Sequence, residues 1–173
     1  MEALSIIKVH DANRYRRLAQ DLDRILVQTT APSYIASFKP RIWTCMLDEE
    51  FVGHSDTTTE IVAAAIVHEA THARLFRCGI GYKESLRARV EAVCFRREIA
   101  FAAKLPDGAV VREQAERSLT HYADPAHWTD AAFDARDLTE IPEALRQLGV
   151  PQWVVRVLLG LRALRRRLRR KSQ

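Results

Sequence analysis

The stretch IVAAAIVHEATHARL, residues 61–75, decides how this sequence is interpreted. Seven apolar residues, 61–67, lead directly into His68, Glu69 and His72. An apolar run of this kind is typical of a helix buried in a protein core. Polar groups inside a core cost free energy unless a hydrogen bond or a metal ion satisfies them. The stretch therefore predicts a buried helix whose three polar side chains have partners elsewhere in the fold.

The three polar residues follow the pattern HExxH. On a helix, residues four apart lie on one face with Cβ atoms about 5–6 Å apart, so His68 and His72 can bind one ion. Zinc binds histidine nitrogens at about 2.0–2.1 Å. Glu69 lies about 100° further around the helix, where it can reach a water molecule on the metal. This division of roles is typical of a metal-dependent hydrolase.

A catalytic zinc site usually has a third protein ligand and one open position. The next predicted helix, at about residues 83–105, carries Glu84, Glu91 and Glu98 with a spacing of seven, and so on one face. Glu84 lies close to the preceding turn, and Glu98 lies about 10 Å beyond Glu91 along the helix axis. If this helix runs antiparallel to the motif helix, Glu91 comes to lie alongside the histidines.

The pattern HExxH, followed by eighteen residues and a glutamate, resembles the gluzincin family of zinc metallopeptidases. The short chain is similar to the smallest members, the minigluzincins, and the resemblance covers about residues 41–105. It implies a zincin-like α+β fold, Zn²⁺ bound by His68, His72 and Glu91, and Glu69 as general base and acid. It also implies that an upstream strand pairs with an extended peptide substrate. The matching segment consists of Trp43, Thr44, Cys45, Met46 and Leu47.

The resemblance implies two further roles. Many gluzincins have an acidic residue shortly after the glutamate ligand that orients a ligand histidine and fixes its tautomer. Phe95 stands four residues after Glu91, so Asp56 and Glu98 are the candidates for this role. A downstream tyrosine or histidine commonly stabilises the oxyanion. The candidates are His121 and Tyr122, with His127 and Tyr82 as alternatives.

The other elements follow from local patterns. Leu4–Val9 and Arg41–Leu47 are rich in strand formers, which predicts two strands, and 48–56 is a connection that could hold another short strand. Thr57 with Glu60 predicts the N-cap of the motif helix, and Gly79 its C′ residue. Further helices are predicted at 12–26, 83–105, 110–122, 130–137, from the N-cap Thr139 to Gly149, and from Val150 onwards. The sum is a helix-rich α+β fold with a small N-terminal sheet and a helical C-terminal part.

Composition predicts one globular domain, residues 1–149, followed by a C-terminal helix at 150–173. The apolar fraction is 47%, and the three cysteines have no regular spacing, which argues against a disulfide framework. The start of the chain does not resemble a signal peptide, and no apolar run of about 18 residues predicts a membrane span. We therefore expect a cytoplasmic location.

The predicted C-terminal helix concentrates the positive charge. Residues 162–171 include seven basic residues and no acid, which leaves 20 basic and 22 acidic residues elsewhere. One face carries an apolar stripe of Val150, Trp153, Val154, Val157, Leu158, Leu161, Leu164 and Leu168. The helix could pack on the domain, or bind an anionic membrane surface at its inner, cytoplasmic face. Nucleic-acid binding is the third interpretation, but no recognition motif favours it.

Other metal sites fit the sequence less well. A di-iron bundle needs a second ExxH, and only Glu69 has a histidine three residues later. A deformylase-like site needs an upstream cysteine, and the surroundings of Cys45 do not match one. A metzincin-like site is excluded because no His or Asp follows within twelve residues of His72. The sequence therefore predicts zinc-dependent peptide-bond hydrolysis, with an inactive zinc-binding scaffold or interaction domain as the alternative.

Overall fold

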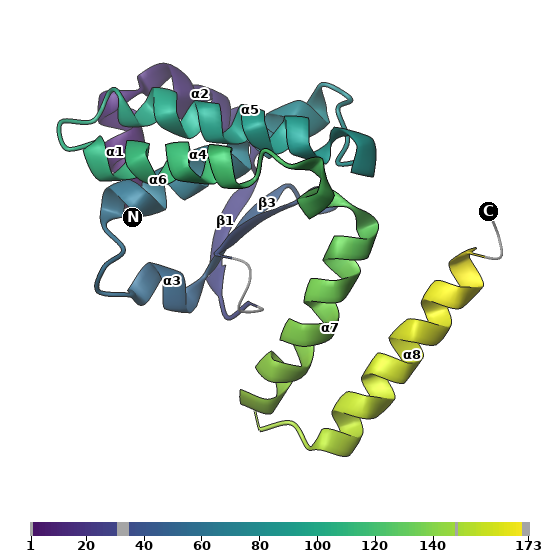
Figure 1. Cartoon of the computed structure of the whole chain (residues 1–173). Helices are drawn as coiled ribbons and strands as arrows, with labels where there is room; N and C mark the ends of the chain where they lie inside the picture. Colours follow the sequence, from purple (N-terminus) through teal and green to yellow (C-terminus); the bar gives the residue numbers. More distant parts are fainter. Residues whose placement is uncertain (1, 31–34, 148, 171–173) are drawn as a thin grey trace. The chain divides into compact units, whose positions relative to one another are not determined.

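A computed structural model of the chain describes residues 2–30, 35–147 and 149–170. These residues form a predominantly helical α+β fold with one three-stranded sheet (Figure 1), which confirms the predicted class. They divide into two compact units, one ending at Thr129 and the other beginning at Asp130. The sequence prediction places its domain boundary later, between residues 149 and 150, because the stop signal at Gly149 precedes the basic segment.

The chain begins with two helices, α1 (Glu2–His10) and α2 (Ala12–Asp21), which pack against each other and against α4 (Thr59–Arg77). The strand predicted at Leu4–Val9 is therefore wrong. Ala3 and Ile7 lie four residues apart on one helical face, and both are buried in the core. Packing of this face against the neighbouring helices outweighs the β propensity of the residues in the segment.

The sheet consists of β1 (Arg24–Gln28), β2 (Ala36–Lys39) and β3 (Thr44–Asp48) in the order β1-β3-β2. The middle strand, β3, pairs in parallel with β1 and antiparallel with β2. The predicted helix at 12–26 is wrong beyond Asp21, because Ile25 and Leu26 belong to β1 and pair with Cys45 and Met46. Their spacing also fits a helix, so only the strand partner decides the conformation.

A short helix, α3 (Glu49–Gly53), replaces the connection predicted after β3. Asp48 caps it by accepting a hydrogen bond from the backbone N–H of Phe51 at 3.0 Å. The same carboxylate accepts hydrogen bonds from the backbone N–H and hydroxyl of Thr30. Burial acts to raise the pKa of Asp48, but these hydrogen bonds lower it below the usual value.

The motif helix α4 is the centre of the first unit. Its core face contains the apolar run of the sequence motif, and the buried members are Val62, Ala63, Ala64, Ala65, Ile66, Val67, Ala70 and Ala73. Thr58, not the predicted Thr57, is the N-cap, and it accepts a hydrogen bond from the N–H of Ile61. Gly79 has a φ of +80°, which confirms it as the C′ residue. Its N–H donates to Phe76 O and that of Ile80 to Leu75 O, the two bonds of a Schellman motif.

After a short turn, α5 (Glu84–Ala102) packs along α4, and α6 (Ala109–His121) packs along α5. A 3₁₀ turn, η1 (Pro125–Trp128), then contacts α5. The sequence predicted α5 and α6 to within a few residues of their observed bounds. The turn between them is tight, since a Cβ atom on Gly108 would lie 1.9 Å from the carbonyl oxygen of Ala102.

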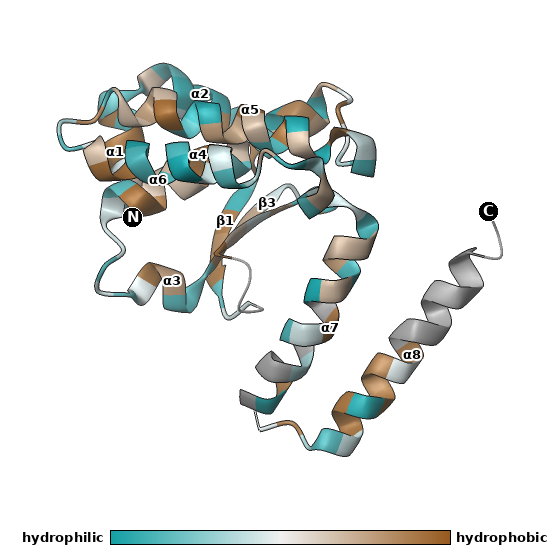
Figure 2. Cartoon of the chain, in the orientation of Figure 1, coloured by the Kyte–Doolittle hydropathy of each residue, from teal (hydrophilic) through white to brown (hydrophobic). Residues whose placement is uncertain are grey.

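The second unit is a pair of helices, α7 (Asp130–Gln147) and α8 (Gln152–Arg170). The predicted break at Thr139 is wrong. Its hydroxyl donates to the carbonyl of Ala135 at 3.0 Å, as within a continuing helix, and Pro142 lies inside α7. Figure 2 shows hydrophobic and hydrophilic residues along the described part of α8, where Trp153 is 69% exposed. The basic side chains of 162–171 lie outside the described residues.

Candidate metal centre

The two histidines of the motif and the glutamate of the next helix meet between α4 and α5. His68 and His72 lie on one face of α4, and Glu91 faces them from α5. The Nε2 atoms of the two histidines are 3.1 Å apart. The carboxylate of Glu91 places Oε2 3.1 Å from Nε2 of His68 and Oε1 3.3 Å from Nε2 of His72. Each side chain is about nine-tenths buried, with an exposed fraction of 8–13%.

These distances fit a bound metal ion. Ligand atoms at about 2.0–2.1 Å from a tetrahedral ion are about 3.3 Å from one another, which is close to the observed spacing. Two imidazole nitrogens and a carboxylate are also the donor types that zinc and other transition metals accept. The residues present therefore fit an ion coordinated by His68, His72 and Glu91.

The histidines and carboxylates of this cluster stabilise one another's charges. Burial acts to raise the pKa of Glu91, but hydrogen bonds with His68 and His72, and their charges, hold it well below its usual range. Burial acts to lower the pKa of His68, but hydrogen bonds with Glu91 and Glu98 raise it well above its usual value. The carboxylates of Glu91 and Glu98 thus stabilise positive charge at His68, and the two histidines stabilise the negative charge of Glu91.

Glu98 occupies the position next to the second nitrogen of His68. Its carboxylate is hydrogen-bonded to Nδ1 of His68. With the proton on Nδ1, Nε2 is left with the lone pair that a metal requires. Of the two candidates for this orienting role, the structure brings Glu98 to the histidine. Asp56 instead lies beside Ser55 and His54 in the loop before α4.

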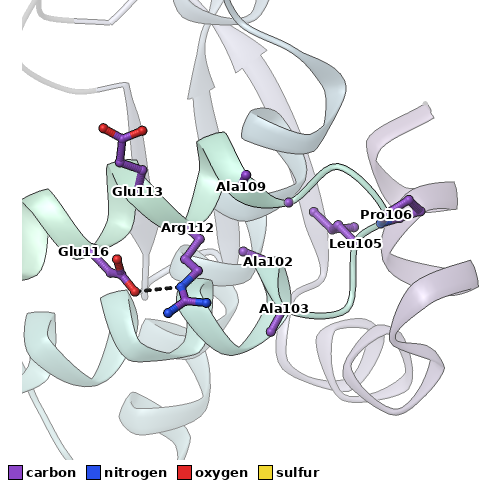
Figure 3. Close-up of a pocket in the computed structure, with 9 residues that line it drawn as sticks. Ala102, Ala103, Leu105, Pro106, Ala109, Arg112, Glu113 and Glu116 are labelled. Carbon is purple, nitrogen blue, oxygen red and sulfur yellow. Dashed lines mark hydrogen bonds and ion pairs between the residues drawn. The ribbon is translucent and has the colours of Figure 1, made fainter.

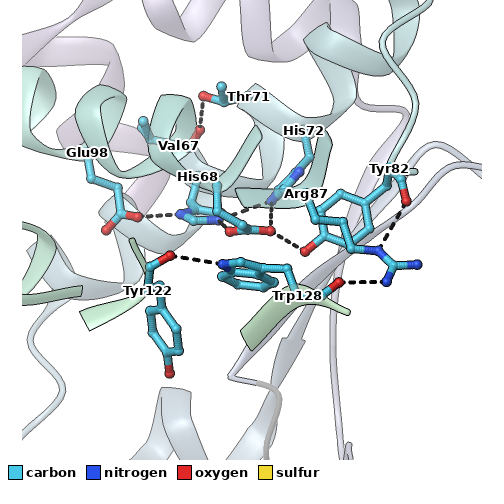
Figure 4. Close-up of polar contacts among 10 residues, drawn as sticks. Val67, His68, Thr71, His72, Tyr82, Arg87, Glu98, Tyr122 and Trp128 are labelled. Atoms are coloured by element: carbon cyan, nitrogen blue, oxygen red, sulfur yellow. Dashed lines mark hydrogen bonds and ion pairs between the residues drawn. The ribbon is translucent and has the colours of Figure 1, made fainter. Parts of the chain in front are cut away.

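Tyr82 contacts Oε1 of Glu91, the carboxylate oxygen that also lies near His72. Its hydroxyl donates a hydrogen bond to Oε1 of Glu91, and its ring packs edge-on against His72 at 5.5 Å (Figure 4). Burial and the carboxylate raise the pKa of Tyr82 above its usual value. Arg87, on α5, donates hydrogen bonds to the carbonyl oxygens of Tyr82 and Trp128. It thereby links the turn before α5 to η1. Of the predicted oxyanion candidates, Tyr82 is the one whose hydroxyl contacts a predicted metal ligand, Glu91.

Glu69 is buried beside the cluster, with an exposed fraction of 6%. Its carboxylate makes no hydrogen bond within the part of the chain that the structure describes. Burial raises the pKa of the Cys45 and Cys94 thiols, and the charge of Glu69 adds to both shifts. The same charge contributes to the raised pKa of His68. A buried carboxylate without a protein hydrogen-bond donor can accept a proton from water at the centre.

Cys94 belongs to the same cluster, which sequence reasoning missed. His68, His72 and Cys94 each offer a ligand atom, and these atoms lie within 4.8 Å of one another, so the group could hold a metal ion. The side chain of Cys94 is fully buried, and burial with the charges of Glu91, Glu69 and Glu98 raises the pKa of the thiol. Its position three residues after Glu91, on the same helical face, was the available signal.

The ring of Phe95 lies between His68 and Tyr122, one of the predicted pair His121 and Tyr122. The ring of Phe95 packs edge-on against His68 at 4.9 Å, and Tyr122 stacks on Phe95 at 6.0 Å. In Figure 4 the side chain of Tyr122 points away from the two histidines. His121 is exposed at the end of α6 and contacts the rings of Tyr122 and His127. Their role as oxyanion stabilisers stays a prediction.

The predicted substrate-binding strand is not at an edge of the sheet. Thr44, Cys45, Met46 and Leu47 belong to β3, whose two sides are already hydrogen-bonded to β1 and β2. Trp43 precedes the strand and has a left-handed φ of +45°. An extended peptide therefore cannot add to β3, and the prediction of this segment as an edge strand is wrong. The sequence identifies a strand but not its neighbours, which depend on long-range pairing.

A shallow pocket lies where α5 turns into α6 (Figure 3), and it contains no residue of the metal centre. It is lined by small residues of the turn and by Arg112, which forms an ion pair with Glu116 at 2.8 Å. The histidines, carboxylates and thiol of the cluster between α4 and α5 all lie outside this pocket.

Two further observations concern the chain as a whole. None of the described helices is long and apolar enough to cross a membrane. Comparison of the chain with models of protein families, with curated proteins and with solved structures finds no match.

Proposed function

We propose that this protein is a zinc-dependent peptidase. The observation that supports the proposal most directly is the triangle of His68 Nε2, His72 Nε2 and the Glu91 carboxylate, with sides of 3.1–3.3 Å. Three protein ligands leave one position of a tetrahedral ion for water or substrate, as catalytic zinc sites require. When bound there, zinc supplies an activated water at neutral pH and polarises a carbonyl group.

The residues of the chain have separate roles in the proposed reaction. His68, His72 and Glu91 hold the ion, and Glu98 keeps His68 in the tautomer that presents Nε2. Glu69 accepts the proton of the attacking water and then donates it to the nitrogen of the leaving amine. Its burial beside the ligands, without a protein hydrogen-bond donor among the described residues, supports this role. Tyr82 fixes the carboxylate of Glu91 through its hydroxyl.

Metal content is the first test of the proposal. The purified chain should contain close to one zinc ion per molecule, and His72→Ala should lose most of it. Glu84→Gln is a matched control, because Glu84 lies on the same helix as Glu91 but is exposed. A protein without metal, or a His72→Ala variant with unchanged metal content, would overturn the proposal.

Hydrolysis is the second test. The zinc-loaded chain should cleave members of a peptide library, and a chelator should abolish cleavage. Glu69→Gln should retain zinc but lose activity, because the amide accepts no proton. Cleavage by Glu69→Gln at the rate of the unchanged chain contradicts the role of Glu69. Stoichiometric zinc without any cleavage instead favours the second candidate function, a zinc-binding scaffold or interaction domain.

A further inference from the structure

The helix α5 presents three potential ligands to the histidines of α4. Glu91, Cys94 and Glu98 are spaced by three and four residues and therefore share one helical face. Glu91 contacts both histidines, and Glu98 contacts His68. Cys94 lies between these two carboxylates along the helix, and its sulfur is the soft donor of the group.

The position of Cys94 brings its sulfur within reach of the same ion. Its Sγ lies within 4.8 Å of a ring nitrogen of His68 and of His72. In a tetrahedral site with a zinc–sulfur distance of about 2.3 Å, sulfur and nitrogen are about 3.5 Å apart. A shift on the order of 1 Å therefore suffices, which is within the range of a side-chain rotation. The thiol is fully buried and makes no hydrogen bond within the described residues, so no protein partner holds it away.

We propose that Cys94 is a fourth protein ligand of this centre and that the zinc-loaded chain rests in a closed form. In the closed form His68, His72, Glu91 and Cys94 occupy all four positions, and the thiol proton has passed to solvent. Peptide hydrolysis at this centre would require an open form in which water replaces the sulfur of Cys94. The inference rests on the proposed metal centre but not on peptide hydrolysis. A closed four-ligand site is also the arrangement expected of a structural zinc domain.

X-ray absorption at the zinc edge tests this proposal on the full chain loaded with one equivalent of zinc. The spectrum should contain one sulfur neighbour at about 2.3 Å, beside nitrogen and oxygen at about 2.0–2.1 Å. Cys94→Ala should remove this neighbour, which is a change from one sulfur per zinc to none. Cys45→Ala is the matched control, because Cys45 is equally buried but lies outside the cluster. Cys78→Ser controls for the exposed thiol.

Cobalt substitution gives a second measurement on the unchanged chain. Co²⁺ bound by a thiolate absorbs strongly in the near ultraviolet through sulfur-to-metal charge transfer, and this band should be present. The spectra of the unchanged chain decide the question even where Cys94→Ala fails to fold. A zinc or cobalt site with only nitrogen and oxygen neighbours overturns the proposal, as does sulfur that persists in Cys94→Ala or a chain that binds no metal. Sulfur ligation without peptide cleavage upholds the proposal and contradicts only the peptidase function.

Discussion

Glu98 lies thirty residues after His68 in the chain, yet its carboxylate is hydrogen-bonded to Nδ1 of that histidine. The contact joins α5 to α4 at the metal centre. Because a carboxylate acceptor holds the proton on Nδ1, the opposite nitrogen, which faces His72 and Glu91, is the one that could offer a lone pair to a metal ion. The carboxylate beside His68 thus comes from the position seven residues after Glu91, while Phe95, four residues after Glu91, packs its ring edge-on against His68.

Replacing Glu98 with glutamine should weaken metal binding by about ten- to a hundredfold, which is the usual effect of losing such a partner. The amide keeps the size of the side chain but removes the charge that stabilises the Nδ1–H of His68. Competition with a chelator of known zinc affinity measures the effect. Glu84→Gln, which is exposed on the same helix, should retain the original affinity. Equal affinities of the two variants contradict the orienting role.

The N-cap of α4 distinguishes two adjacent threonines. Thr58→Ala should lower the free energy of unfolding by about 1 kcal/mol, because the N–H of Ile61 loses its acceptor. Thr57→Ala should have a smaller effect, since the side chain of Thr57 caps no helix in the structure. Urea denaturation of both variants measures the difference. If Thr57→Ala lowers the free energy of unfolding more than Thr58→Ala, Thr57 is the N-cap, as the sequence predicts.

Glycine at position 108 is required by the close approach of α5. Gly108→Ala should destabilise the protein by roughly 1–3 kcal/mol, because its Cβ would overlap the carbonyl oxygen of Ala102 and the chain must shift. Gly53→Ala is the control, since nothing lies within 4 Å of a Cβ at that position. The melting temperature should fall for the first variant and stay nearly constant for the second. Equal melting temperatures would show that the turn adjusts freely.

Asp11 contributes a pH-dependent part of the stability. Burial acts to raise the pKa of this carboxyl, but hydrogen bonds from Lys104 and Arg14 lower it below the usual 3.8. Since the folded-state pKa is the lower one, the contribution is complete above about pH 4 and is lost as the pH falls further. Asp11→Asn keeps an N-cap acceptor for α2 but removes the charge.

We therefore expect Asp11→Asn to be less stable than the unchanged chain at pH 7. The difference in unfolding free energy should shrink as the pH falls below 4. Denaturant titrations at a series of pH values measure it. A difference that is the same at pH 7 and pH 3 would mean that the ion pairs of Asp11 with Lys104 and Arg14 contribute nothing to the stability.

The interpretation of α8 as a membrane-surface helix predicts that the chain floats with anionic vesicles and not with neutral ones. Trp153, Val157, Leu158 and Leu161 are each about half exposed or more, so apolar side chains are available to insert. Trp153→Glu should reduce flotation, because it places a charge on the inserting face. If the intact chain does not float with anionic vesicles, the membrane interpretation is wrong.

The sequence by itself determined the parts that depend on local spacing. The apolar run before His68 predicted the buried helix, Gly79 predicted its end, and the interval from His72 to Glu91 predicted which glutamate meets the histidines. These predictions succeed because helical geometry relates sequence distance to position in space over one or two helices.

Tertiary structure decided what depends on neighbours far away in the chain. Leu4–Val9 is helical because Ala3 and Ile7 pack into the core. Ile25 belongs to a strand and not to the preceding helix because it pairs with β3. The central position of β3 in the sheet depends on its pairing with β1 and β2, which local sequence patterns do not encode. Only the packing of α5 against α4 brings Cys94 and Glu98 to His68, because side-chain contacts between helices depend on their rotation and relative position.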